Sequence, residues 1–183
     1  SVILSNKKKA MIRKGTKDDI KTVAEIYSRI HDMEETGKVT IGWVRAIYPT
    51  QKTAEDALAK DELFVLEDCG EVVAAAKINR EQVPEYADCK WENDAPDDEV
   101  MVLHTLVVDP LKGGKGYGTQ FVDFYEKYAL ENGCKYLRMD TNEKNTNARK
   151  LYKKLGYKEP GIVPCVFNGI DGVQLVCLEK TLK

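Results

Sequence analysis

Residues 107–118 form the strongest local signal in the chain: Val107-Val108-Asp109-Pro110-Leu111-Lys112-Gly113-Gly114-Lys115-Gly116-Tyr117-Gly118. An apolar run over residues 100–108 predicts a strand, which should end at Pro110 because proline has no N–H for a sheet ladder. A helical pattern over residues 119–131 follows, and its first N–H groups would point back into the loop. Because glycines let a ligand approach the backbone closely, the stretch predicts an anion site, most often for phosphate.

The loop alone leaves several interpretations open. A P-loop requires Gly, four residues, then Gly-Lys-Ser/Thr, and no such string occurs. A dinucleotide-binding fingerprint requires Gly-x-Gly-x-x-Gly near the start of a βαβ unit. Gly114, Gly116 and Gly118 have a different last spacing and lie past the middle of the chain. A plain glycine-rich surface turn is the remaining alternative.

Length, composition and charge limit the class of protein. The 183 residues fit one domain, and 43% apolar with 32% charged residues is ordinary for a soluble globular protein. The longest apolar runs, such as residues 72–76, fall far short of the roughly 18 residues of a membrane span. The net charge of −2 argues against general nucleic-acid binding, which needs a basic surface.

The cysteines predict the redox state of the compartment, and the N-terminal residues predict where the folded domain begins. The five cysteines are odd in number and none are spaced as Cys-x-x-Cys, which favours reduced thiols in a cytoplasm over disulfides or a metal site. Residues 7–9 are lysines without the apolar run of a signal peptide. Periodicity begins at Met11, so we expect an extension over residues 1–10 and a single domain over 11–183.

Hydrophobic periodicity predicts an alternation of strands and helices. Capping boxes at Thr16–Asp19 and Thr53–Asp56 predict the starts of the first two helices, which run to Ile30 and Ala59. Two further helices are expected over residues 119–131 and 145–155, and strands over 11–14, 63–67, 72–79, 100–108, 135–141, 162–167 and 173–182. This order favours an α/β (α+β) domain with a mostly antiparallel central sheet and helices on its faces.

Two blocks in the second half of the chain together resemble the GCN5-related N-acetyltransferases. Residues 106–118 resemble their acetyl-coenzyme A motif: Leu-Val-Val-Asp-Pro, a short spacer, then Gly-Lys-Gly-Tyr-Gly. Residues 145–157 resemble their C-terminal motif, with Asn145, Ala148, Leu151-Tyr152 and Leu155-Gly156-Tyr157. The order and separation of the blocks also match. The resemblance implies the family fold and transfer of an acetyl group to an amine.

The resemblance implies acetyl-coenzyme A as the co-substrate, with no metal. Backbone N–H groups at the helix start would hold the pyrophosphate, and the strand before the loop would bond the amide-rich arm like an added strand. The residues implied to bind it are Leu106, Val107, Val108, Lys112, Gly113, Gly114, Lys115, Gly116, Tyr117, Gly118, Thr119, Asn145 and Tyr152.

Gly113 departs from the family pattern, which usually has Arg or Gln there to position the phosphates. Lys112 and Lys115 are the available substitutes, as point charges rather than planar forks. A single charge near a helix end contributes about 0.3–1 kcal/mol. We therefore expect weakened binding rather than its loss.

Tyr152 occupies the general-acid position of the family. A phenol with a reference pKa of about 10 is protonated at neutral pH and can give a proton to a leaving thiolate. Tyr152 also lies on an apolar stripe with Ala148, Leu151 and Leu155, so a purely structural role is the alternative. Asn145 would bond the pantetheine arm or a water, and it also suits a helix N-cap.

The general base is less marked in the sequence. Glu99 ranks first, because it borders the acidic stretch where an amine would enter. His104 ranks second for its useful pKa, although a lone strand histidine is more often simply accommodated. Asp140 ends the next strand, and many members of the family use water instead.

The acceptor is a primary amine of a small molecule or peptide, on this interpretation. The acidic stretch over residues 92–99 would attract a cationic amine, or is simply a solvated charge run. Trp43, Tyr48 and Trp91 would wall the acceptor pocket, or belong to the core. A homodimer is a further partner that the resemblance implies.

The alternative function is a catalytically silent module that binds or senses an acyl-coenzyme A. A third interpretation, a nucleotide-phosphate enzyme, would rest on the glycine loop alone.

Overall fold

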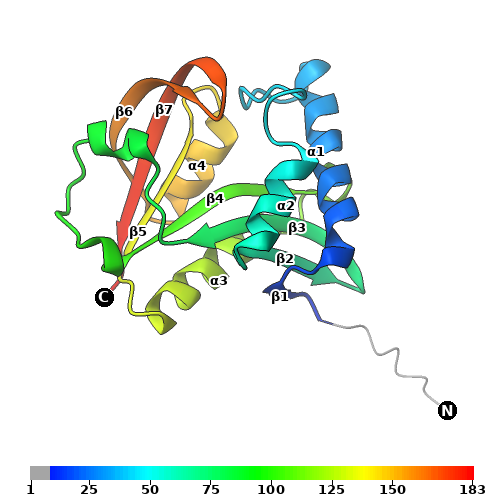
Figure 1. The fold of residues 1–183 in the computed structure, drawn as a ribbon, viewed down its shortest axis with the longest axis horizontal. Coiled ribbons are helices and arrows are strands. Elements are labelled where there is room, and N and C mark those ends of the chain that lie inside the picture. The colour runs from blue at the N-terminus through cyan, green and yellow to red at the C-terminus, as the bar shows by residue number, and fades with distance from the viewer. Residues whose placement is uncertain (1–8) are drawn as a thin grey trace.

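The computed structural model describes residues 9–183, so most of the expected extension over residues 1–10 lies outside the described residues. Seven strands form one sheet in the order β1-β2-β3-β4-β5-β7-β6 (Figure 1). All neighbouring strands are antiparallel except β4 and β5, which confirms the expected mostly antiparallel sheet. The elements are β1 (Met11–Lys14), α1 (Ile20–Glu35), α2 (Gln51–Ala59), β2 (Leu63–Asp68), β3 (Glu71–Asn79), β4 (Val100–Val108), α3 (Tyr117–Glu131), β5 (Tyr136–Asn142), α4 (Thr146–Lys154), β6 (Lys158–Phe167) and β7 (Ile170–Thr181).

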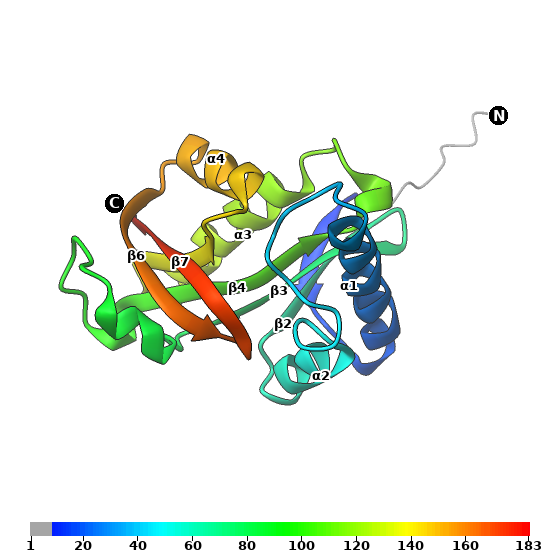
Figure 2. The same cartoon turned by 90° about the horizontal axis from the view of Figure 1, so that it is seen from above.

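Helices α1 and α2 cover one face of the sheet, and α3 and α4 cover the other (Figure 2). Apolar residues of α1 and α2 pack with Leu63, Val65 and Ala75, which project from one face. The alternate residues Phe64 and Ala74 project from the other face and pack with α3 and α4. The period-two alternation of a strand therefore places both helix pairs. Among residues 9–183, no helix is long and apolar enough to cross a membrane.

The sheet splits in its middle. β4 pairs with β5 only from Val100 to Leu103, and beyond that point the two strands have no paired residues. On its other side β4 stays paired with β3, but the register shifts between Ala75 and Lys77 because β4 holds one extra residue there. Thr105 lies in this bulge with a left-handed φ of 52°. The bulge and the split leave the last residues of β4 open toward β5.

Several boundaries differ from the sequence-based prediction, including that of β6, which begins at Lys158 rather than at residue 162. The capping box of α2 uses Thr50 and Thr53, so the helix begins earlier than the Thr53–Asp56 box predicts. Helix α1 continues past Ile30 to Glu35, where Glu34 and Glu35 bind the following loop. The turn between β6 and β7 consists of Asn168 and Gly169 alone, both with left-handed φ, as a tight hairpin turn requires.

Candidate active site

The split sheet opens into a cavity of about 570 Å³. Its walls come from the open end of β4, the end of β5 and the inner side of α4, so segments far apart in sequence meet there. A second hollow of about 390 Å³ adjoins it on the α1 and α2 side. Tyr48, Thr105 and Asp140 line both hollows and form the wall between them.

The glycine loop lies at one end of the larger cavity, which Gly113 helps to line. Gly114 and Gly116 adopt left-handed φ values of 77° and 74°, and a Cβ at either would meet only open space. The N–H groups of residues 115–119 donate no hydrogen bond within residues 9–183. These free donors at the start of α3, with open space before them, fit the pyrophosphate of coenzyme A.

Other predicted cofactor contacts fall along the same cavity. Leu106, Val107 and Val108 line it, and their stretch of β4 has no strand partner on the β5 side. An extended amide-rich arm therefore fits beside them. Lys112 pairs with Glu71 at 3.3 Å, so its charge is partly engaged. A Cβ on Gly113 would touch only a carbonyl oxygen of Pro110 at 3.7 Å, so glycine is not sterically required there.

An ion pair that the sequence did not reveal fixes the start of the loop. Arg29 of α1 donates from Nε and Nη2 to the two carboxylate oxygens of Asp109, each at 3.1 Å. The same carboxylate accepts the N–H of Leu111 at 3.0 Å. The only signal in the sequence is Asp109 itself, an acid at the end of an apolar run. The structure buries it, and its partner Arg29 lies 80 residues earlier in the sequence.

Tyr152 projects from α4 into the larger cavity. It is almost fully buried, and its hydroxyl makes no hydrogen bond within residues 9–183. Burial, together with the charge of Asp140, raises the pKa of Tyr152, so the phenol holds its proton. Asn145 also lines the cavity, and its side chain caps α4 by accepting the N–H of Ala148 at 3.2 Å.

Asp140 is a carboxylate that lines the same cavity as Tyr152, and its charge acts on the Tyr152 phenol. It is the first residue of β5 beyond the stretch paired with β4, and Tyr86 donates its hydroxyl to Asp140 Oδ2 at 2.6 Å. Burial raises the pKa of Asp140 to about 6, against the opposing effect of the Tyr86 bond. At neutral pH Asp140 is therefore a carboxylate that accepts a proton readily.

The two residues ranked first as bases lie elsewhere or are poorly suited. Glu99 precedes β4 and lines neither hollow. It lies six strand residues from Thr105, roughly 20 Å along an extended chain, so the structure does not bring it to the site. His104 lines the second hollow and bonds Asn79 Oδ1 through Nε2 at 2.7 Å. Burial, with the charge of Lys77, lowers the pKa of His104 to about 3, which leaves a weak base.

The acidic connection also lies away from the site. Trp91 donates from Nε1 to the carbonyl oxygen of Tyr86 at 2.8 Å, and the centre of its ring lies 4.3 Å from the guanidinium of Arg138. Trp91 lines neither hollow. Residues 92–99 accompany it along the outer part of the sheet, so the expected attraction of an amine by this stretch is not supported by its position. Trp43 and Tyr48 do line the larger cavity, as predicted.

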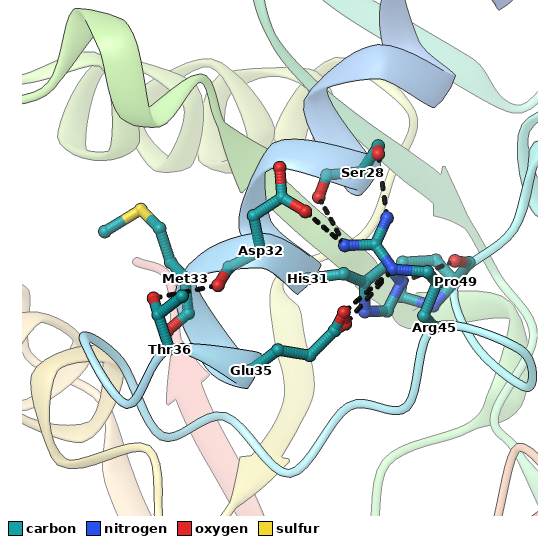
Figure 3. A network of polar contacts seen from close by, with 8 residues as sticks. All are labelled: Ser28, His31, Asp32, Met33, Glu35, Thr36, Arg45 and Pro49. Carbon is teal, nitrogen blue, oxygen red and sulfur yellow. Dashed lines mark hydrogen bonds and ion pairs between the residues drawn. The ribbon is translucent and has the colours of Figure 1, made fainter.

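The loop over residues 36–50 forms one wall of the larger cavity, and side chains of α1 hold this loop in place (Figure 3). Arg45 donates to Glu35 Oε1 at 3.0 Å and to Ser28 Oγ at 2.8 Å, and it also bonds Asp32. The Glu34 carboxylate accepts the N–H groups of Ile41 and Gly42. Buried His31 contacts Pro49 O through Nε2 at 2.9 Å. This wall is therefore ordered before any acceptor arrives.

Comparison with known proteins agrees with this geometry. Residues 23–157 match the acetyltransferase (GNAT) family. The chain is 27% identical over 158 residues to an uncharacterised N-acetyltransferase, MJ1207, of Methanocaldococcus jannaschii, covering 83% of this chain and 62% of that protein. It is 37% identical over 60 residues to an uncharacterised N-acetyltransferase, YhfO, of Bacillus subtilis, covering 33% of this chain and 40% of that protein. The chain thus spans less than two thirds of the length of these curated relatives.

Solved structures show the same fold. A GNAT-family acetyltransferase from Streptococcus agalactiae superposes with a TM-score of 0.76 at 22% identity, covering 97% of this chain and 98% of that one. The acetyltransferase yncA from Salmonella typhimurium, solved with acetyl-CoA, gives a TM-score of 0.66 at 19% identity, with 95% and 94% covered.

Proposed function

This chain belongs to the GNAT acetyltransferase family, and we propose that it moves an acetyl group from acetyl-coenzyme A to a primary amine of a small molecule or peptide. Transfer would be direct, within a ternary complex. One observation carries the proposal: the Tyr152 phenol and the Asp140 carboxylate line a single cavity that the glycine loop bounds at its end. The adjoining hollow gives an amine its own route to the same wall.

The two side chains fit opposite proton transfers. Acetyl-coenzyme A, when bound, supplies the acetyl group as a thioester. Asp140, with its raised pKa of about 6, takes a proton from the ammonium form of the acceptor and frees the nitrogen lone pair. Tyr152 keeps its proton at neutral pH, gives it to the departing sulfur, and regains one from the nitrogen that has bonded to the acetyl carbon. We therefore propose Asp140 as the base in place of Glu99 and His104.

Direct transfer fits the surroundings of the cavity. A covalent route needs an activated nucleophile such as a thiolate. Within residues 9–183, none of the cysteines lines either hollow. Burial raises the pKa of the Cys177 thiol, which makes it a poorer nucleophile still. All five cysteines are free thiols, which supports placing the protein in a reducing, cytoplasmic compartment as part of the proposal.

The function is tested by release of free thiol from acetyl-coenzyme A over a panel of amines, with calorimetry for binding of the donor. Tyr152→Phe should lower kcat roughly a hundredfold or more, the range for losing a positioned acid, and leave donor affinity unchanged. Full turnover by Tyr152→Phe would falsify the acid role.

A silent acyl-coenzyme A-binding module is the rival function. It predicts donor binding without thiol release from any amine. Gly113 is the feature that favours it, because the usual phosphate-positioning side chain is missing. Tyr152 and Asp140 favour the enzyme, because a module that only binds has no use for a paired acid and base in its cavity.

A further inference from the structure

The side chain of Lys77 places an ammonium group in the wall of the second hollow. Residues Lys77 of β3 and His104 of β4 are paired across the sheet, so both side chains project from the α1 and α2 face into that hollow. The Lys77 side chain is only 26% exposed. Its ammonium carries three donors that an anionic group in the hollow can accept.

The ammonium of Lys77 has no close acceptor among residues 9–183. Its nearest acidic atom is Glu62 Oε2 at 3.9 Å, beyond hydrogen-bond distance. That same oxygen already accepts the side-chain amide of Asn79 at 2.8 Å. Glu62 therefore balances part of the charge of Lys77 and leaves its donors free for another group.

The other charged side chains around this hollow do not compensate Lys77. Lys52 and Asp56 of α2 pair with each other at 3.0 Å and are largely exposed. Glu81 is exposed at the rim. His104 is neutral at physiological pH, because burial and the charge of Lys77 lower its pKa to about 3. Among residues 9–183, the interior of the hollow thus offers the Lys77 ammonium, which makes no hydrogen bond and is paired with Glu62 only at 3.9 Å.

A negative group stands at the other side of the same hollow. Asp140 lines both hollows, and it is the residue proposed to receive the proton of the acceptor amine. A ligand in the hollow meets the Asp140 carboxylate of β5, where the amine would react, and the Lys77 ammonium of β3 on the other side of β4. Apolar Ile47, Val83 and Phe167 line the space as well. A volume of about 390 Å³ suits a small molecule.

We propose that Lys77 binds an anionic group of the acceptor, so that the acceptor is an amine that also carries a carboxylate, such as an amino acid or a short peptide. The inference rests on the proposed function, because it assumes that the amine reacts beside Asp140. Lys77 then sets specificity and takes no part in the proton transfers.

Matched pairs of amines test the assignment. Each amino acid is compared with its carboxamide and with the corresponding decarboxylated amine, by kcat/KM for thiol release. The carboxylated member should be preferred roughly tenfold or more, the value of a charge-assisted hydrogen bond. Lys77→Met should abolish this preference, while Lys77→Arg should retain much of it. Lys127→Met is the control, since it removes an exposed lysine of α3 that lines neither hollow.

A binding measurement separates this inference from the function itself. Calorimetry of an amino acid with the protein saturated by coenzyme A should show binding that Lys77→Met loses and Lys127→Met keeps. Unchanged affinity for coenzyme A in every variant shows that the fold is intact. Turnover of amines without a carboxylate preference overturns the role of Lys77 and leaves the function standing. Carboxylate-dependent binding without turnover upholds Lys77 and overturns the function.

Discussion

At the scale of single residues, Asp140, which we propose as the base, carries a cost in stability. Its folded pKa of about 6 lies above the ordinary value of 3.8, so the fold disfavours its charged form. The cost is absent below pH 4, grows between pH 4 and 6, and is fully present above pH 6. Asp140→Asn should therefore raise Tm at pH 8 and leave it nearly unchanged at pH 4, as thermal melts at both pH values would show.

The same substitution should reduce activity. Wild-type kcat/KM should fall below about pH 6 as Asp140 becomes protonated, and Asp140→Asn should lose that acidic limb along with most of the rate. Asparagine can still accept the hydroxyl of Tyr86, so the geometry around the site is kept. A variant that kept both the rate and the acidic limb would rule Asp140 out as the base.

Residue roles differed in how far the sequence revealed them. The glycines, Asn145 and Tyr152 belong to local motifs, and local motifs are complete within a dozen residues. The role proposed for Asp140 depends on Tyr86, which lies 54 residues earlier, and on the split between β4 and β5. Such roles depend on contacts between distant segments, which no local pattern in this chain encodes.

At the scale of elements, the loop over residues 36–50 joins α1 to α2 and has no regular structure of its own apart from a bridge between Val44 and Tyr48. Arg45 holds it to α1 through Glu35, Asp32 and Ser28 (Figure 3). These are exposed contacts, which contribute little to global stability. They order a wall of the cavity, so their loss should be felt in binding.

Arg45→Ala should accordingly raise KM for the acceptor amine several-fold and change Tm little. Lys127→Ala, which removes an exposed ion pair with Asp123 on α3, serves as the control and should change neither quantity. Steady-state kinetics and thermal melts measure both. An unchanged acceptor KM in Arg45→Ala would mean that the wall is held without this network.

The elements themselves followed from periodicity, while the bulge in β4 did not. The run over residues 100–108 is apolar except for His104 and Thr105, and a polar pair within a strand does not mark Thr105 as the residue that takes a left-handed φ. The bulge and the split at Leu103 decide which end of β4 carries the site. From the sequence alone, Glu99 at the start of β4 is as plausible a base as a residue near the other end of that strand. A strand pattern specifies which faces are buried, and it leaves the end at which neighbouring strands separate unspecified.

At the scale of the whole molecule, the sheet is joined across its middle by only four paired residues on each side, Val100–Leu103 of β4 and Tyr136–Met139 of β5. The larger cavity lies where that pairing stops, with residues of α1, β4, β5 and α4 in its walls. A coenzyme lying along β4 would contact both halves of the sheet at once. Its binding should therefore stabilise the molecule as a unit.

Coenzyme A at a hundred times its Kd should add about 2.7 kcal/mol to the free energy of unfolding, equivalent to a rise in Tm of roughly 5–10 °C for a chain of this size. Thermal melts over a concentration series measure this rise. Pantetheine, which lacks the pyrophosphate, should give a smaller shift at equal concentration, because it leaves the free N–H groups of residues 115–119 unpaired. Equal shifts from the two ligands would mean that the glycine loop contributes nothing to binding, and the anion site inferred from residues 107–118 would then be refuted.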